Sequence, residues 1–214
     1  MTSARAGLVI AAVIAIGACK SPSEPSPTPV MIPLQSSAWE TISEPQPFPL
    51  ANDGAALTFN FPSSGSMNYL FTPVSMPNLH GTLSVTIRIT TSGPVVFNSL
   101  DPQTGACTIP SSVRPLIWAN NNGNGEFDRW WSNPRSITLA AGTNTINVPL
   151  TADAWSSVNG KLANADGPTT VSFGHALLNV SRLGVTFGGG CSFGHGVNVP
   201  NGTATFAITD YSIR

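Results

Sequence analysis

Charged residues are scarce in this 214-residue chain. Nine are Lys or Arg and ten are Asp or Glu, 9% in all, and they leave a formal net charge of −1. Nucleic-acid-binding domains carry clustered basic residues, and the sequence shows no such cluster. Ser, Thr, Asn and Gly supply most of the polar surface. That composition suits an exported β-protein and contacts with neutral, hydroxyl-rich ligands.

Catalytic signatures are also lacking. There is no H-E-x-x-H motif, and the glycine-rich stretch at 187–196 lacks both the strand-to-helix context and the lysine of nucleotide sites. His195 follows Cys191 at a ligand-like spacing, but the chain has only three histidines, so we do not expect a zinc site. We therefore favour a protein that is not an enzyme.

Convergent carboxylates are the alternative to this view. Glu126 and Asp128 lie too close together to be the two facing acids of a glycosidase, but Asp101 or Asp210 could approach either of them in space. A polysaccharide hydrolase or lyase is therefore less favoured than two non-catalytic functions, a binding module and a structural lipoprotein.

The chain begins with one basic residue, Arg5, and an apolar run from Gly7 to Ala18. Roughly a dozen apolar residues are too few for a permanent membrane helix but suit an export signal. The run ends in IGAC, which resembles the lipobox of bacterial lipoproteins. The resemblance implies a signal peptide at 1–18, a lipid on Cys19 and a place in the bacterial cell envelope. We expect the outer membrane, because Lys20 does not look like an inner-membrane retention signal.

Three cysteines are present. If lipid takes Cys19, the remaining two, Cys107 and Cys191, can pair. Because the compartment beyond the inner membrane is oxidising, we predict a disulfide between them.

A proline- and serine-rich stretch, 20–38, predicts an extended or unstructured spacer behind the lipidated cysteine. Residues 39–214 have the length of one domain with its own core. We therefore divide the chain into a signal (1–18), an anchor and linker (19–38) and one domain (39–214).

Alternation of apolar and polar residues predicts an all-β domain. Residues 82–90 place Leu83, Val85, Ile87 and Ile89 on one face, which indicates a half-buried strand. The same pattern occurs near residues 144–150, 182–188 and 202–213. Further strand candidates are 55–61, 67–74, 94–98, 113–119, 128–132, 135–140 and 175–180.

Two local irregularities are also predicted. Apolar residues change parity between Ile208 and Tyr211, so we expect a bulge near Thr209–Asp210. One short helical turn is expected at 151–158, anchored by Trp155.

Three stretches, LTADAWSSVNGK, LGVTFGGGCSFGHGV and GTATFAITDYSI, resemble galactose-binding-like jelly rolls. The resemblance implies a two-sheet antiparallel β-sandwich, a fold common among carbohydrate-binding modules. It supports the fold more than the function, because such folds host many activities.

Residues 120–125 read N-x-N-x-N-G, the spacing that begins a calcium loop. Its three ligand positions are neutral amides and position 12 is Trp131 instead of a glutamate, so the EF-hand reading fails. An irregular or structural calcium site that uses Glu126 and Asp128 is the remaining alternative, and we predict no cofactor. The simpler interpretation is a hairpin loop over 120–127.

The segment 114–135 concentrates charge and tryptophan. It holds five charged residues and three of the five tryptophans. Sugars are bound by aromatic faces together with Arg, Asn and acidic side chains, and those residue types occur here. Alternation places Arg114 and Trp118 on one face, and Trp130 and Trp131 on opposite faces. One of the last two is therefore expected in the core and the other more exposed. The candidate ligand-binding residues are Arg114, Trp118, Asn122, Glu126, Asp128, Arg129, Trp130 and Trp131.

Ordinary packing is the competing interpretation of this segment. At least two of the three tryptophans are then core residues, and Arg129 pairs with Asp128 or Glu126. We favour an envelope-anchored binding module, for carbohydrate, over a structural lipoprotein that binds another envelope protein.

Overall fold

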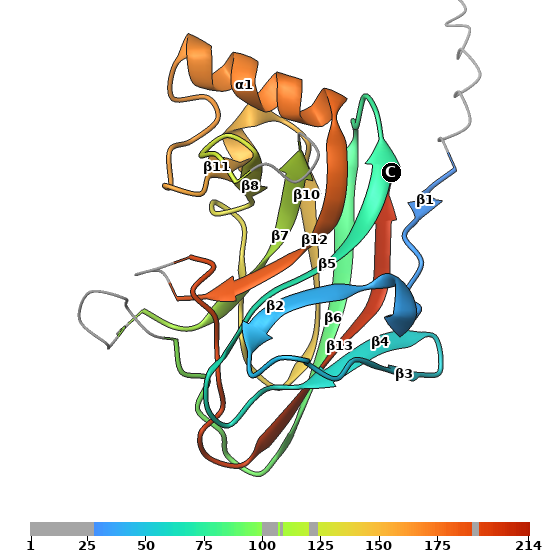
Figure 1. Ribbon diagram of the computed structural model, residues 1–214, viewed down its shortest axis with the longest axis vertical. Helices are drawn as coiled ribbons and strands as arrows, with labels where there is room; N and C mark the ends of the chain where they lie inside the picture. Colours follow the sequence, from blue (N-terminus) through green and yellow to red (C-terminus); the bar gives the residue numbers. More distant parts are fainter. Residues whose placement is uncertain (1–27, 100–106, 108, 120–123, 190–192) are drawn as a thin grey trace, which may run out of the picture.

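Two antiparallel sheets pack as a sandwich, which confirms the predicted all-β fold class (Figure 1). The structure is a computed structural model that describes residues 28–99, 107, 109–119, 124–189 and 193–214. We refer to the sheets as sheet A and sheet B. Every strand pair in both sheets is antiparallel.

Sheet A contains six strands in the order β10-β6-β13-β4-β3, with β1 also paired to β13. Their bounds are β1 Val30–Met31, β3 Ala51–Asp53, β4 Ala56–Asn60, β6 Thr82–Ser92, β10 Gly142–Pro149 and β13 Thr203–Ile213.

Sheet B contains seven strands in the order β11-β8-β7-β12-β5-β2, with β9 also paired to β7. Their bounds are β2 Glu40–Glu44, β5 Ser66–Met76, β7 Ser112–Ala119, β8 Arg129–Trp131, β9 Ile137–Thr138, β11 Ser156–Ser157 and β12 Val180–Gly188. The consecutive strands β7 and β8 pair antiparallel, as a hairpin requires, while residues 120–123 of the predicted loop lie outside the described residues.

The main core lies between the sheets. The four apolar residues that alternate along β6 are all buried there, as expected from the period of a half-buried strand. The register of β13 against β6 shifts between Ile208 and Asp210, which confirms the predicted bulge. As a result, Phe206 and Ile208 before the shift and Tyr211 and Ile213 after it are all buried.

One α-helix, α1 (Gly167–Leu178), lies across one end of the sandwich (Figure 1). The sequence analysis missed it and wrongly predicted a strand at 175–180. The helix starts because Asp166 caps it by accepting a hydrogen bond from the Thr169 amide at 2.8 Å, with a proline in the first turn. Phe173 and Ala176 are buried on the side of the helix that packs against the sandwich.

Other local predictions have mixed outcomes. The helical turn at 151–158 exists as a short 3-10 helix, η3 (Ala152–Ala154), and buried Trp155 anchors it by donating to the Pro149 carbonyl at 2.9 Å. The strand predicted at 94–98 is wrong, because only Asn98 forms a bridge, to Asn198. A proline at its first position cannot donate to a ladder.

The N-terminal part of the sandwich lies inside the stretch predicted as linker. There β1 pairs with β13, a second 3-10 helix η1 (Ser36–Ala38) follows, and Ile32 between them is buried. Residues 1–27 lie outside the described residues, and with them Cys19 and the predicted signal.

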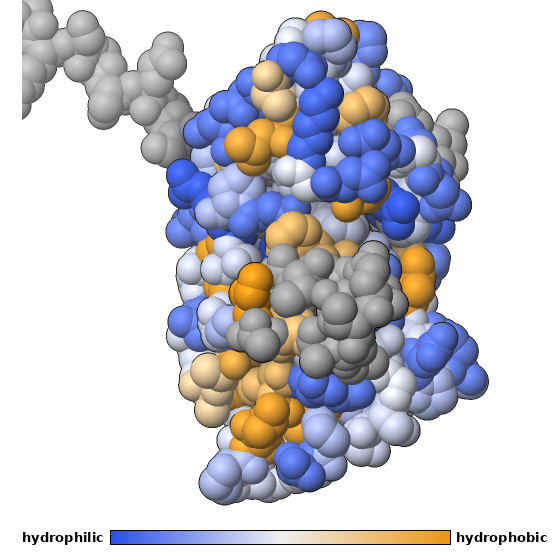
Figure 2. Space-filling model, turned by 90° about the vertical axis from the view of Figure 1, so that its left-hand side faces the viewer, coloured by the Kyte–Doolittle hydropathy of each residue, from blue (hydrophilic) through white to orange (hydrophobic). Residues whose placement is uncertain are grey.

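One face of the molecule has a mixed surface. Figure 2 shows this side, with mostly hydrophilic residues over the upper part, where α1 lies, and hydrophobic residues in separate groups. In the described part of the chain, no helix has both the length and the hydropathy that crossing a membrane requires.

Candidate functional site

The outer face of sheet B carries a second aromatic cluster, separate from the main core. It consists of Tyr69 and Phe71 from β5, Leu116 and Trp118 from β7, and Trp131 from β8. Alternation along each strand explains it, because the neighbours of these residues point inward into the core. We call this cluster, with the arginines that contact it, the outer-face site.

Three residues form a row across the middle of this site. Trp118 pairs in register with Arg129 on one side and with Arg182 on the other. The guanidinium carbon of Arg129 lies 5.4 Å from the Trp118 ring and that of Arg182 lies 4.7 Å from it. Both distances fall within the range of cation–π contacts. The sandwich therefore holds two cations against one indole.

Each arginine of the row has a further contact with β5. Arg182 also lies over the ring of Phe71, at 4.6 Å. Arg129 donates from Nη1 to the hydroxyl of Tyr69 at 3.5 Å. Burial raises the pKa of the Tyr69 phenol, although the charge of Arg129 opposes that shift. The phenol is therefore neutral and able to donate at neutral pH.

Arg114 lies deeper, with 2% of its surface exposed. Its Nη1 donates to Asn133 Oδ1 at 3.1 Å, its Nη2 donates to Ser112 Oγ, and its guanidinium lies 4.2 Å from the Phe193 ring. Desolvation lowers its pKa to about 10, so the side chain keeps its charge at neutral pH. Arg114 has no carboxylate partner among the described residues, and burying an unpaired charge is costly, which makes this residue unusual for a purely structural position.

Several buried donors in the site lack hydrogen-bond partners among the described residues. They are Arg114 Nε, Arg129 Nε and Trp131 Nε1. Buried polar groups are almost always satisfied in folded proteins. Three unsatisfied donors on one face are therefore a property to explain.

The acidic candidates contact the backbone or a hydroxyl. Glu126 Oε1 accepts from Ser157 Oγ at 3.1 Å, and Asp128 Oδ2 accepts from the Gly125 amide at 2.8 Å. The latter contact stabilises the turn that ends the hairpin loop, just before β8. Asn122, another predicted ligand-binding residue, lies outside the described residues.

The two adjacent tryptophans point to opposite faces, as alternation predicts. Trp130 belongs to the main core, where it stacks on Phe127 and packs edge-on against Phe173. The expectation that the tryptophan outside the core is exposed is wrong, because that residue is Trp131 and it retains only 3% exposure.

A turn after β12 covers Trp131. The Phe193 ring packs edge-on against it, with ring centroids 6.2 Å apart. Gly194 has a φ of +75°, and a Cβ at that position would lie 2.4 Å from the Tyr69 hydroxyl and 2.9 Å from the Trp131 ring. Glycine there permits both the backbone conformation and the close approach, as expected for this glycine-rich stretch.

The sequence analysis missed the members of the site that lie outside the segment 114–135: Tyr69, Phe71, Arg182 and Phe193. The sequence analysis also missed a G-x-S-x-G motif. Residues 190–194 read GCSFG, which has the spacing of a hydrolase nucleophile elbow. That elbow requires a strand, a turn and then a helix, whereas the next element described after β12 is β13. Residues 190–192 lie outside the described residues, and among them the serine.

The predicted disulfide partner Cys191 lies outside the described residues too, so the pairing stays a prediction. A Cβ built on Gly189 would lie 2.9 Å from Cys107 Sγ, so the chain passes Cys107 two residues before Cys191.

For calcium or zinc, the described residues contain no group of three or more His, Cys, Asp or Glu side chains suited to a metal.

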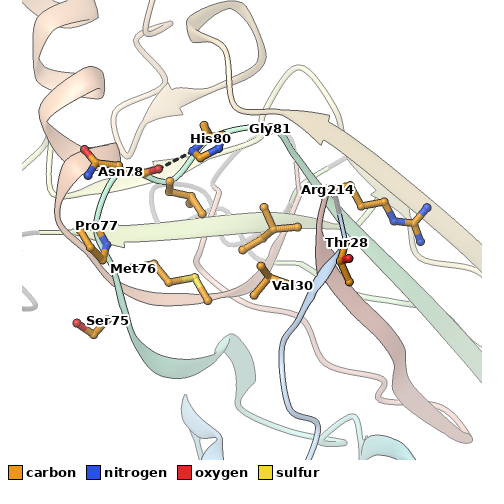
Figure 3. Close-up of a pocket in the computed structure, with 11 residues that line it drawn as sticks. Thr28, Val30, Ser75, Met76, Pro77, Asn78, His80, Gly81 and Arg214 are labelled. Carbon is orange, nitrogen blue, oxygen red and sulfur yellow. Dashed lines mark hydrogen bonds between the residues drawn. The ribbon is translucent and has the colours of Figure 1, made fainter. Parts of the chain in front are cut away.

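A separate hollow of about 470 Å³ lies where β1, the β5–β6 turn and the C-terminus meet (Figure 3). His80 Nδ1 and the Asn78 carbonyl oxygen lie 2.7 Å apart at its edge. Val30, Met76, Leu79 and Ile213 make its wall mainly apolar. None of the ligand-binding residues predicted from the sequence lines it, and its lining includes no Trp, Tyr or Phe.

No protein-family model matches the chain, and no curated protein matches it. Among solved structures, a point mutant of a family 29 carbohydrate-binding module is 11% identical with a TM-score of 0.38, over 87% of this chain and 83% of that one. A second family 29 mutant is 11% identical with a TM-score of 0.37, over 87% and 89%. A sialidase is 10% identical with a TM-score of 0.39, and the match covers 87% of this chain but 18% of the sialidase. These identities and TM-scores are too low to show a family or a function.

Proposed function

We propose that the protein is a carbohydrate-binding module and that the outer-face site is its binding surface. The observation that carries this proposal is the group of unsatisfied donors, Arg114 Nε, Arg129 Nε and Trp131 Nε1, beside a cluster of aromatic rings. Sugar hydroxyls accept such hydrogen bonds, and sugar C–H surfaces stack on aromatic rings. In the row across Trp118, the unsatisfied donor Arg129 Nε and the indole ring lie next to each other, so one sugar could contact both.

Binding requires side chains to move. Trp118 and Trp131 are each 3% exposed, because Arg129 and Arg182 lie on Trp118 and the turn at 193–196 lies on Trp131. Arginine side chains have several rotatable bonds and can lift from the ring without a change in the backbone. A sugar that replaces a guanidinium on Trp118 stacks on the same ring, while the displaced arginine can bond its hydroxyls.

Polysaccharide binding by affinity electrophoresis tests the proposal, with a panel of plant, algal and bacterial polymers. Arg129→Ala with Arg182→Ala should abolish the retardation seen with the native chain. The matched control is Arg88→Ala, because Arg88 is an arginine on sheet A whose partner Asp53 lies 3.3 Å away. Failure of the native chain to bind any polymer, or equal loss in the control, contradicts the proposal.

We also propose that Cys19 carries a lipid that anchors the module to the bacterial envelope. Support comes from the apolar run that ends at Cys19 and from the proline-rich stretch behind it. Expression in a bacterial host fed a clickable palmitate analogue should label the native chain but not a Cys19→Ser variant. Equal labelling of both chains contradicts the anchor without affecting the binding proposal.

A further inference from the structure

We infer that the saccharide bound by the outer-face site is anionic, carrying carboxylate or sulfate groups that Arg129 and Arg182 hold. This inference rests on the proposed carbohydrate-binding function and adds the charge class of the ligand.

Sheet geometry fixes the spacing of the two backbone positions that carry these cations. Arg129 on β8 and Arg182 on β12 are both in register with Trp118 on β7, so they lie two strand spacings apart. Neighbouring strands are about 4.8 Å apart, so the two backbones lie about 10 Å from each other. The guanidinium carbons lie 5.4 Å and 4.7 Å from the same indole, so two like charges share one ring.

Only one of these two cations has an ion-pair partner among the described residues. The ion pairs formed between described residues are Arg88–Asp53, Lys161–Asp166 and Arg182–Glu40. In the last pair the atoms are 3.9 Å apart and the Glu40 side chain is 53% exposed, so that contact is loose and solvent-screened. Neither Arg114 nor Arg129 belongs to any of the three pairs.

The other two acids near the site already accept hydrogen bonds at the end of β8. Glu126 accepts from Ser157 and Asp128 accepts from the Gly125 amide. Neither carboxylate forms an ion pair with Arg129 among the described residues, so a ligand anion is the counter-charge that this guanidinium lacks.

The free donor on Arg129 has the geometry for such an anion. Arginine binds carboxylates through two parallel N–H groups, and its Nε is one of the five donors of the planar fork. Arg129 Nε is buried and without a partner among the described residues, and Arg129 Nη1 makes only a long contact with Tyr69. Arg182 keeps 19% of its side chain exposed, so the neighbouring guanidinium is open to the same ligand.

The overall charge of this chain does not favour the binding of anions. The formal net charge is −1, so a polyanion is repelled by the molecule as a whole. Any preference for an anionic polymer must therefore come from a local cluster of cations, which makes the inference specific.

Matched polymer pairs test the inference in the full chain. The carboxylate pair is polygalacturonate and its methyl ester, and the sulfate pair is dextran sulfate and dextran. We expect at least one anionic polymer to bind about tenfold or more tighter than its neutral partner in 20 mM salt, with that advantage falling at 500 mM. Whichever pair shows the preference identifies the anionic group.

Variants separate a specific site from diffuse charge effects. Arg129→Gln and Arg182→Gln keep most of the side-chain volume, and each should remove the preference for the anionic member. Arg88→Gln changes the net charge equally and should leave the preference intact. Equal binding of neutral and anionic partners overturns the inference while leaving the proposed function in place. No binding of any polymer overturns the proposed function itself.

Discussion

Arg129 and Arg182 lie on opposite sides of Trp118, in register across three adjacent strands, with their guanidinium carbons 5.4 Å and 4.7 Å from the one ring. The strands that carry them are far apart in the chain. The arrangement therefore depends on the sandwich as a whole. It combines a stacking surface with two cations, of which Arg129 has no ion-pair partner among the described residues.

Replacing the two adjacent tryptophans should have different effects. Trp130→Ala removes a fully buried ring from the main core, where it packs on Phe127 and Phe173, and should lower the free energy of unfolding by about 3–5 kcal/mol. Trp131→Ala removes a ring from the outer face and should abolish glycan binding as well. Urea unfolding and affinity electrophoresis separate the two. Loss of glycan binding in a folded Trp130→Phe variant, with Trp131→Phe unaffected, would contradict this assignment.

A methyl group at Gly194 should open the cover over Trp131. The new Cβ of Gly194→Ala lies 2.4 Å from the Tyr69 hydroxyl, so the turn has to shift, and tryptophan fluorescence should move to longer wavelength. Gly54→Ala is the matched control, because it has a similar φ of +59° and no atom within 4 Å of the added group. The control should cost only the left-handed backbone penalty, about 1–2 kcal/mol, with unchanged fluorescence. Identical spectra for both variants would show that the turn does not seal the site.

Acid should weaken the end of the sandwich that carries α1. Hydrogen bonds from Lys161 and Thr169 hold the pKa of Asp166 well below its ordinary value. A carboxyl whose pKa is lower folded than unfolded stabilises the protein above the unfolded value, about 3.9, and loses that contribution as the pH falls toward the folded value. The melting temperature should therefore fall more steeply below about pH 4 in the native chain than in Asp166→Asn, which keeps a capping oxygen. Parallel pH profiles for the two chains would argue against this role.

The predicted disulfide is open to a direct chemical test. Peptide mapping without reduction should yield one linked peptide pair containing Cys107 and Cys191 from protein recovered from an oxidising compartment. In the chain-entropy model, the paired substitution of both by serine should lower stability by about 4 kcal/mol. Alkylation of both thiols in the unreduced protein would contradict the pairing.

The predictability of each part of the structure follows from how local its cause is. The strands with clear alternation, β6, β10, β12 and β13, were all predicted, and so was the bulge in β13, because period and parity are properties of neighbouring residues. The helix α1 was missed because it contains two glycines and several β-branched residues, which have low helix propensity. Its Asp166–Pro168 start was the signal that could have identified it.

The candidate site was only half visible for a different reason. Alternation placed Arg114 with Trp118 and separated Trp130 from Trp131, because each pair shares a strand. The burial of Trp131 depends on a turn more than sixty residues later in the chain, and Arg182 reaches Trp118 from β12. Local patterns carry no information about such non-local contacts.

Binding of glycan to the outer face of sheet B can be measured by NMR, through the indole N–H signals of the five tryptophans. We predict that addition of an oligosaccharide of the best-bound polymer shifts the signals of Trp118 and Trp131, which lie in the outer-face site. Those of Trp39, Trp130 and Trp155, in the main core, should remain in place. Shifts confined to the core tryptophans, or to residues around the hollow at Met76 and His80, would contradict the account.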